Sequence, residues 1–234
     1  MFEKKYVHSI VLASGSGARF GGDVPKQFQM LGDMPVFLHS VRKFDKIKFV
    51  DGIVLVVPQD DLVHCRNLAI RYGMTKVTSV VAGGKSRQES TYHGLLALDA
   101  GVDSIVLVHD AVRPFVDEDE TVSLIETANA HDAAILALPV TDTIKSADTT
   151  GLAVQTVNRE HLYAAKTPQA AHLTDLLAAH EKARQDGFEA TDDCQLIENI
   201  GIYPKIVITK PTNIKITTGV DLDFAAFLLE RGIV

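Results

Sequence analysis

The chain has few cysteines and no long apolar run, and each shortage excludes a class of protein. Only Cys65 and Cys194 among its 234 residues are cysteines, and they lie far apart without a C-x-x-C spacing. The sequence therefore argues against a disulfide framework and a cysteine-rich zinc site, and it predicts a protein of the reducing cytoplasm. No apolar stretch reaches the ~18 residues of a membrane span. The stretch after Met1–Tyr6 is too short for a secretory signal, so none is expected.

Basic residues are also in short supply. Lysine and arginine total 23 against 30 aspartates and glutamates, which gives a formal net charge of −7, and they form no long cluster. Duplex nucleic acid is therefore not an expected partner, because binding it requires a basic patch. A content of 46% hydrophobic and 23% charged residues is that of a globular domain rather than a disordered chain.

Short β-branched runs alternate with stretches of helical period along most of the chain. Strands are expected at Val7–Leu12, Gly52–Val57, Val77–Val81, Ser104–Val108 and Ala133–Leu138. The stretches between them repeat apolar residues at helical spacing. This alternation predicts an α/β protein with a doubly wound, mostly parallel sheet, forming a single domain over residues 1–234. In such sheets ligands bind at the carboxyl ends of the strands.

The last part of the chain departs from this rhythm. Residues 139–160 alternate polar and apolar positions on both sides of a turn at Asp148–Gly151, which predicts a β-hairpin. This hairpin is either a dimerisation arm that projects from the core or an ordinary surface hairpin. Helices are expected at His172–Gln185, Asp193–Asn199 and Asp221–Arg231, and strands at Ile206–Thr209 and Ile214–Thr217.

The loop after the first expected strand, residues 12–27, is rich in glycine. It is not the dinucleotide fingerprint G-x-G-x-x-G, because Phe20 stands at the third glycine position, and it is not G-x-x-x-x-G-K-[ST], because Asp23 replaces the lysine. Its glycines are accompanied by Arg19 and Lys26. Backbone N–H groups and two cations suit a triphosphate, because they stabilise the negative charge that grows during phosphoryl transfer. The alternative is a flexible loop with solvated cations.

Further blocks of glycine and polar residues follow in order along the chain. They are Gly83–Ser90, His109–Pro114, Pro139–Lys145, Asn158–Arg159, Thr167–Gln169, Thr191–Asp193 and Asn213–Thr217. Together with the first loop they resemble the ordered motifs of the 2-C-methyl-D-erythritol 4-phosphate cytidylyltransferase family of sugar nucleotidyltransferases. The resemblance covers nearly the whole chain. It implies a Rossmann-like nucleotidyltransferase fold and a cytoplasmic, Mg²⁺-dependent enzyme that forms a homodimer through the arm at residues 139–160.

The resemblance also implies roles for individual residues. Those implied to be catalytic are Arg19, Lys26 and Lys215. Those implied to bind the nucleotide are Ala13, Ser14, Gly15, Gly17, Gly83, Gly84, Ser90, Asp110 and Ala111. Those implied to bind the acceptor are Arg113, Thr143, Arg159 and Thr191. Asp110 is implied to lie beside the magnesium ion as well.

Several of these residues have an ordinary structural interpretation too. Asp110 can cap a helix, Ser90 can belong to a capping arrangement with a glutamate, and Lys215 can point to solvent. Asp192, next to Thr191, can likewise cap a helix. His109 is expected to be structural rather than a metal ligand, because no second histidine or cysteine has supporting spacing.

The function implied by the resemblance is transfer of CMP from CTP to 2-C-methyl-D-erythritol 4-phosphate, which supplies isoprenoid precursors. The products are 4-diphosphocytidyl-2-C-methyl-D-erythritol and pyrophosphate. The alternative is the related ribitol-5-phosphate cytidylyltransferase, which makes CDP-ribitol for cell-wall polymers. A nucleotide-binding module without catalysis and a dinucleotide oxidoreductase are hypotheses from other classes. Lys85 stands where many family members carry aspartate, which weakens the inference of base recognition by this block or leaves it to backbone groups.

Overall fold

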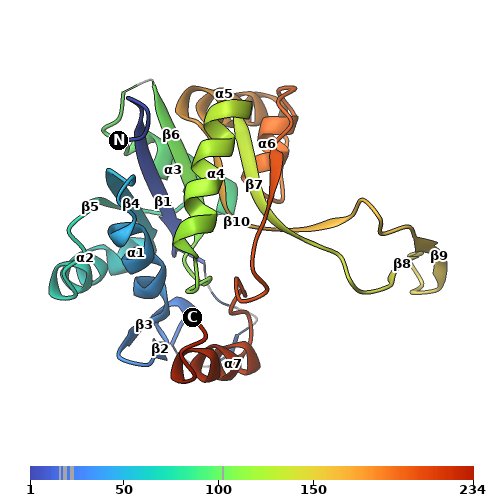
Figure 1. The fold of residues 1–234 in the computed structure, drawn as a ribbon, viewed down its shortest axis with the longest axis horizontal. Helices are drawn as coiled ribbons and strands as arrows, with labels where there is room; N and C mark the ends of the chain where they lie inside the picture. Colours follow the sequence, from blue (N-terminus) through green and yellow to red (C-terminus); the bar gives the residue numbers. More distant parts are fainter. Residues whose placement is uncertain (16, 18–19, 22–23, 102) are drawn as a thin grey trace.

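The computed structural model describes residues 1–15, 17, 20–21, 24–101 and 103–234. In this part of the chain seven strands form one sheet in the order β11-β7-β10-β6-β1-β4-β5 (Figure 1). Their bounds are β1 (Tyr6–Leu12), β4 (Gly52–Val57), β5 (Val77–Ala82), β6 (Ser104–Asp110), β7 (Ala133–Pro139), β10 (Tyr163–His172) and β11 (Lys205–Ile208).

Parallel pairing dominates this sheet. β1 pairs in parallel with β4 on one side and β6 on the other, so that Ile10 lies in register with Val54 and Val108. Of the seven strands β10 alone is antiparallel to its neighbours, β6 and β7. β4 and β6 are buried along their whole length, which explains their near-continuous β-branched sequences. The predicted doubly wound, mostly parallel sheet is confirmed.

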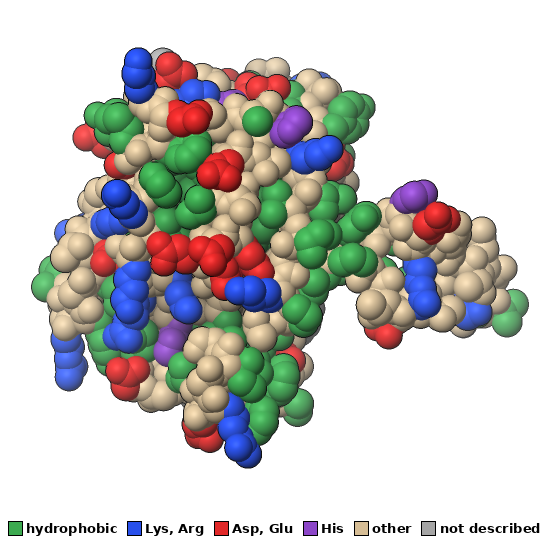
Figure 2. All heavy atoms as spheres, in the orientation of Figure 1, with side chains coloured by type: hydrophobic (Ala, Val, Ile, Leu, Met, Phe, Trp, Pro, Cys, Tyr) green, Lys and Arg blue, Asp and Glu red, His purple; other side chains and the backbone are tan. Residues whose placement is uncertain are grey.

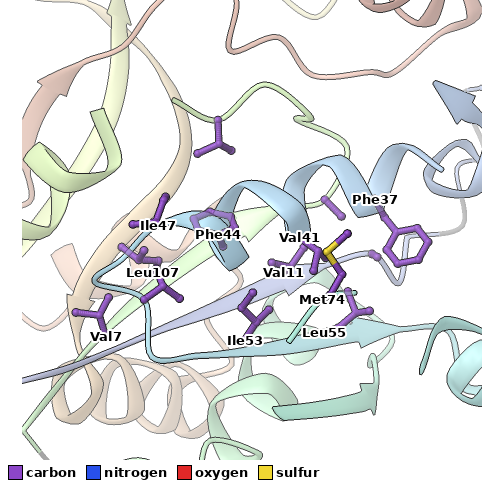
Figure 3. Packing of buried hydrophobic residues seen from close by; sticks show 14 of the residues in the cluster. Val7, Val11, Phe37, Val41, Phe44, Ile47, Ile53, Leu55, Met74 and Leu107 are labelled. Atoms are coloured by element: carbon purple, nitrogen blue, oxygen red, sulfur yellow. The ribbon is translucent and has the colours of Figure 1, made fainter. Parts of the chain in front are cut away.

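Helices cover both faces of the sheet. One face packs against α1 (Val36–Lys46), α2 (Leu62–Arg71) and α4 (Glu118–His131). The other packs against α3 (Arg87–Leu96), α5 (Leu173–Asp186) and α6 (Asp193–Glu198). Figure 3 shows Phe37, Val41 and Phe44 of α1 directed at the sheet. Their spacing of three and four residues places them on one face of the helix, as the apolar period predicts.

The structure differs from the sequence-based expectation at two places. The strand predicted over Ile214–Thr217 is wrong, because this segment is an extended loop without a ladder. Its alternation reflects burial, since Ile216 is fully buried and its N–H donates to the Val112 carbonyl at 2.9 Å. Strand β10 was not predicted, because Pro168 lacks an N–H and interrupts the β pattern. Its register against β7 shifts between Ala165 and Gln169, a site where a strand tolerates proline.

A smaller layer closes the carboxyl edge of the sheet. The helix α7 (Gly219–Glu230) packs with the short ribbon of β2 (Met30–Leu31) and β3 (Met34–Pro35) around a third apolar cluster. Thr218 caps α7 in a capping box with Asp221. Two 3-10 turns, η1 (Lys26–Phe28) and η2 (Gln59–Asp61), complete the elements. No helix of the described ranges combines the length and apolar character that crossing a bilayer requires.

The predicted hairpin is confirmed and projects from the body. It consists of β8 (Ile144–Ala147) and β9 (Ala153–Val157), with Ile144 opposite Val157. At its turn Oδ1 of Asp148 accepts the N–H groups of Thr150 at 2.9 Å and Leu152 at 3.0 Å. Figures 1 and 2 show the hairpin as a lobe joined to the body by a narrow neck. Its role in dimerisation stays a prediction.

Candidate active site

A cavity of about 540 Å³ opens where the strand order reverses, at the carboxyl ends of β1 and β6. Leu12 and Asp110 are the last residues of these strands and lie in register with each other. This is the place where open α/β sheets bind ligands. The predicted site residues that line it are Ala13, Ser14, Gly15, Gly17, Lys26, Gly84, Ser90, Asp110 and Lys215.

The described lining of the cavity is strongly cationic. It contains four cationic side chains, those of Lys26, Lys85, Arg87 and Lys215, and a single carboxylate, that of Asp110. The chain as a whole carries a formal net charge of −7. Positive charge is therefore concentrated at the one concave site that the glycine loop borders, which favours an anionic ligand.

Backbone and hydroxyl groups from two loops and from helix α3 meet on one side of the cavity. Ser14 donates from Oγ to Oγ of Ser90 at 3.0 Å, and the Gly84 N–H donates to the same Ser90 oxygen at 3.0 Å. Gly83 is required by this contact, because a Cβ there would stand 2.3 Å from the Cβ of Ser14. The β5–α3 loop and the first loop therefore approach each other as closely as backbone allows.

Helix α3 begins beside the same cavity. Its N-cap is Ser86, whose Oγ accepts the Glu89 N–H at 3.0 Å, while the Glu89 carboxylate accepts the Lys85 N–H at 2.6 Å. The capping interpretation of this block is thus correct for Ser86 and Glu89. The hydroxyl of Ser90 instead donates to the Ser86 carbonyl at 2.8 Å, while its oxygen accepts the Ser14 hydroxyl and the Gly84 N–H.

Gln27 anchors the start of the first loop. Nε2 of Gln27 donates to the Gly15 carbonyl at 2.8 Å, and the Gln27 side chain is buried. Gly17 has a φ of +68°, a region that favours glycine. Lys26 follows Pro25 at the start of η1 and lines the cavity. Arg19 lies outside the described residues, so its predicted role stays a prediction.

Asp110 is held between two cations at the centre of the site. Its Oδ1 accepts Nε of Arg87 at 3.0 Å, and its Oδ2 accepts Nζ of Lys215 at 2.6 Å. Burial works to raise the pKa of Asp110, but the charges of Arg87 and Lys215 outweigh it and hold the pKa well below its usual value. The carboxylate is therefore ionised, and Lys215 points into the site rather than to solvent.

Arg87 was not among the predicted site residues. Its Nη1 donates to Oδ2 of Asp193 at 2.7 Å, and Asp193 is buried at the start of α6. Nε2 of the buried His180 lies 3.7 Å from the other Asp193 oxygen. The signal for Arg87 was its place at the first turn of a helix that follows two glycines. Asp193 belongs to the Thr191–Asp193 block, but nothing in the sequence indicated its pairing with Arg87, because the two residues are 106 positions apart.

His109 is structural, as expected. Nε2 of His109 lies 3.1 Å from the Arg113 carbonyl, which can only accept, so Nε2 carries the proton and donates. Nδ1 of the neutral ring therefore accepts the Thr167 hydroxyl at 3.0 Å, and the oxygen of that hydroxyl accepts the Asp110 N–H at 3.1 Å. Burial lowers the pKa of His109 to about 3, which keeps the ring neutral. This network fixes the backbone on both sides of Asp110.

The remaining predicted residues lie outside the cavity lining. Ala111 is fully buried, and its carbonyl accepts the Ser40 hydroxyl at 2.9 Å. The Thr191 hydroxyl donates to Oε1 of Gln195 at 3.1 Å, while the neighbouring Asp192 caps α6 as the structural interpretation predicts. Arg113 is buried and donates from Nη1 to the Asn213 carbonyl at 3.1 Å. Whether these residues bind ligands stays a prediction.

The two predicted arm residues stand apart from this site. Thr143 is exposed at the base of the hairpin, and the exposed Arg159 donates from Nη1 to the Thr141 carbonyl. Neither lines the cavity of its own chain. Their side chains face outward on a projecting lobe, so any substrate contact they make involves a surface other than the described cavity.

The potential metal ligands of the site fit an ion that is shared with the phosphates of a bound substrate. No group of three or more potential metal ligands occurs within the described part of the chain. Asp110 is the single carboxylate in the described cavity lining. Magnesium is commonly held by one or two carboxylates together with substrate phosphates and water, and a lone carboxylate fits that habit. A resident metal held by protein ligands alone does not fit the described residues.

Nearly the whole length of this chain is similar to proteins of one family. The family model of 2-C-methyl-D-erythritol 4-phosphate cytidylyltransferase (IspD) matches residues 7–231. A protein of this name from Geobacter metallireducens is 40% identical over 229 residues, covering 96% of this chain and 98% of the relative. Another from Geotalea uraniireducens is 41% identical over 225 residues, covering 95% of this chain and 96% of the relative.

Solved structures agree with these sequence matches. The 4-diphosphocytidyl-2C-methyl-D-erythritol synthase of Anaerococcus prevotii superposes with a TM-score of 0.83 at 33% identity. That alignment covers 97% of this chain and 99% of the solved chain. The fold is thus shared over essentially the whole chain.

Proposed function

This chain belongs to the 2-C-methyl-D-erythritol 4-phosphate cytidylyltransferase family, and we propose that it transfers CMP from CTP to 2-C-methyl-D-erythritol 4-phosphate. The products are 4-diphosphocytidyl-2-C-methyl-D-erythritol, an isoprenoid precursor, and pyrophosphate. The observation that carries this proposal is the cationic cavity at the switch point of the sheet, which is bordered by the glycine loop and contains Lys26, Arg87 and Lys215 around one carboxylate.

The triphosphate of CTP occupies the cationic part of this cavity. Lys26 at the glycine loop and Arg19 in the same loop hold the β- and γ-phosphates, the future pyrophosphate. The base and ribose contact the Gly83–Ser90 block, which borders the cavity at the start of α3. Free N–H groups at a helix start and hydroxyls suit these polar edges.

The reaction is an in-line displacement. An oxygen of the acceptor phosphate attacks the α-phosphorus and forms the new P–O bond, while the bond from this phosphorus to the β-phosphate oxygen breaks. Pyrophosphate leaves with that electron pair. Lys215, fixed 2.6 Å from Asp110, stabilises the negative charge on the α-phosphate oxygens. Positioning and preplaced charge account for catalysis, because no covalent intermediate is needed.

Magnesium is the proposed cofactor, held by Asp110 and the phosphates. When bound, the ion supplies positive charge that offsets the repulsion between the triphosphate and the incoming phosphate. Asp110 is ionised and is therefore competent as a ligand. Chelation is expected to abolish pyrophosphate release, and added Mg²⁺ is expected to restore it.

The acceptor is proposed to bind at the interface of a homodimer. Thr143 and Arg159 project on the arm of one chain, away from that chain's own cavity. An arm that crosses to a second copy would bring Arg159 to the acceptor of that copy. A planar guanidinium suits a phosphate monoester, because it can donate two parallel hydrogen bonds.

The test is a comparison of acceptors. The protein is incubated with CTP, Mg²⁺ and either 2-C-methyl-D-erythritol 4-phosphate or ribitol 5-phosphate, and kcat/KM is obtained from pyrophosphate release. A higher value for the methylerythritol acceptor is expected. A higher value for ribitol 5-phosphate would assign the alternative reaction. CTP binding without pyrophosphate release from either acceptor would contradict catalysis altogether.

A further inference from the structure

The two carboxylate oxygens of Asp193 have different surroundings. Oδ2 accepts Nη1 of Arg87 at 2.7 Å, whereas Oδ1 faces Nε2 of His180 at 3.7 Å. Within the described part of the chain, neither this Oδ1 nor this Nε2 has a hydrogen-bond partner. Asp193 and His180 are both buried. A buried polar atom without a partner is unfavourable because it has lost its hydration, so each of these two atoms depends on the other.

The ring of His180 packs against the helix that carries Arg87. His180 belongs to α5, and its ring stacks on Tyr92 of α3 with the centroids 5.9 Å apart and the planes at 27°. The guanidinium carbon of Arg184, one helical turn further along α5, lies 4.8 Å from the centroid of the same Tyr92 ring. Aromatic stacking restricts the rotation of the imidazole and keeps its Nε2 beside Asp193.

Asp193 in turn determines where Arg87 lies. The guanidinium spans two carboxylates, with Nη1 on Asp193 and Nε on Asp110 at 3.0 Å. Burial works to raise the pKa of Asp193, but the charge of Arg87 and, after it, the contact with His180 hold the pKa below its ordinary value. If the Asp193 carboxylate turned, the guanidinium would lose one of its two anchors. The orientation of Asp110 at the centre of the cavity would then be less restricted.

We propose that His180 is a positioning residue for CMP transfer. Its Nε2–H holds Oδ1 of Asp193, so that Oδ2 stays on Arg87 and Arg87 stays on Asp110. The kinetic consequence rests on the proposed function. His180 does not line the cavity that contains Asp110, and it therefore acts only through Asp193. A buried polar network confines its members to one arrangement, and catalysis by preplaced charge requires such confinement.

Two substitutions in the full chain separate the donor of His180 from its ring. His180→Phe keeps a ring against Tyr92 and removes the donor, whereas His180→Gln keeps a side-chain N–H donor and removes the ring. Glu181→Ala, at the exposed neighbouring position on α5, is the matched control. We expect kcat for pyrophosphate release to fall roughly threefold to thirtyfold in His180→Phe, the range for a residue that acts through others. His180→Gln and Glu181→Ala should stay within about twofold of the parent chain.

The opposite order of the two His180 variants would overturn the proposal. A lower kcat in His180→Gln with a parent-like kcat in His180→Phe would mean that the ring matters through packing and not through its donor. An unchanged kcat in His180→Phe would also overturn it.

Nuclear magnetic resonance tests the same contacts without catalysis. The Nε–H signal of Arg87 is identified by its disappearance in Arg87→Lys. Its exchange with water should be roughly threefold to thirtyfold faster in His180→Phe and unchanged in His180→Gln, because only the first frees the guanidinium. Equal exchange in both variants and the parent chain would overturn the proposal. If the parent chain transfers no CMP, the proposed function fails, and these exchange rates alone decide whether His180 positions Arg87.

The ring of His180 in the parent chain gives a reading that needs no variant. Its Nε2 should carry a proton, which a nitrogen-resolved spectrum of the imidazole shows directly. An unprotonated Nε2 would overturn the proposal even if His180→Phe did not fold.

Discussion

Nη1 of Arg87 lies 2.7 Å from Oδ2 of Asp193, a carboxylate that is 1% exposed. The same guanidinium reaches Asp110 from Nε at 3.0 Å. Asp193 therefore holds Arg87 against the carboxylate at the centre of the cavity. Burial works to raise the pKa of Asp193, but the charge of Arg87 has the larger opposing effect, and the pKa lies below its ordinary value. The pair is therefore ionic.

Removing Asp193 is expected to be costly for folding. Asp193→Ala leaves Arg87 half-paired and His180 without its acidic neighbour, so the free energy of unfolding should fall by about 3–5 kcal/mol. Asp192→Ala, which removes the cap of α6 and the hydrogen bond that Asp192 accepts from Nε2 of Gln169, should cost about 2 kcal/mol. Urea denaturation of both variants measures the difference. Equal losses would mean that the buried pair contributes no more than a helix cap.

Lys26 should matter for turnover more than for folding. Lys26→Ala is expected to lower kcat by about 10²–10³, the effect of losing one preplaced electrostatic donor in a transition state. The melting temperature should stay close to that of the parent chain, because Lys26 lies at the cavity surface. Pyrophosphate release under saturating substrates measures kcat, and near-normal turnover would remove Lys26 from the catalytic role.

Gly83 should be intolerant of a side chain. A Cβ at this position would stand 2.3 Å from the Cβ and 2.4 Å from Oγ of Ser14, so Gly83→Ala has to displace the first loop. KM for CTP is expected to rise at least tenfold, since ~1.4 kcal/mol of lost binding corresponds to that factor. The control is Gly219→Ala, where nothing lies within 4 Å of the added carbon. Similar KM values for both variants would contradict the close-approach argument.

Stability should fall as the solution is acidified from neutral pH. Burial lowers the pKa of His109 from its ordinary value of 6.5 to about 3. Between these values the unfolded chain binds a proton that folded His109 does not bind. This one group therefore removes about 2 kcal/mol between pH 7 and pH 5. The lowered pKa values of His8 and His39 act in the same direction.

The variant His109→Asn isolates this contribution. Its free energy of unfolding should change less between pH 7 and pH 5 than that of the parent chain, whatever its absolute stability. Urea denaturation at the two pH values gives both differences. Asp110 does not interfere, because its depressed pKa removes stability only below its ordinary value of 3.8. Equal pH dependence in both proteins would contradict the buried neutral imidazole.

The arm predicts complementation between two inactive chains. If Arg159 acts on the cavity of a second copy, Lys26→Ala and Arg159→Ala damage a site from different subunits. Mixed dimers then contain one intact site, and equal mixing should restore about a quarter of the parent activity because half of the dimers are hybrid. The measurement is CMP transfer after co-refolding. Activity no higher than the average of the two variants would place Arg159 within its own subunit's site.

The amino-acid sequence alone predicts the layers of strands and helices and the residue types that give the loops their chemistry. Near-continuous runs such as Gly52–Val57 and the apolar period of Val36–Phe44 encode a buried strand and a half-buried helix, because local geometry dictates both patterns. Glycines and cations in order along the chain identified the family and most of the cavity lining. The wrongly predicted strand at Ile214–Thr217 shows the limit of such patterns, because alternation of apolar residues indicates burial and not pairing between strands.

The pairing of charged side chains depends on the folded arrangement of the chain and could not be predicted from the sequence. Asp110 pairs with Lys215, which is 105 residues away along the chain, and Arg87 pairs with Asp193, which is 106 residues away. Neither distance along the chain carries a periodic signal, because ion pairs depend on position in space alone. The same is true of Thr167 and Asp110, which meet because β10 runs back antiparallel beside β6 and brings the root of the arm to the site.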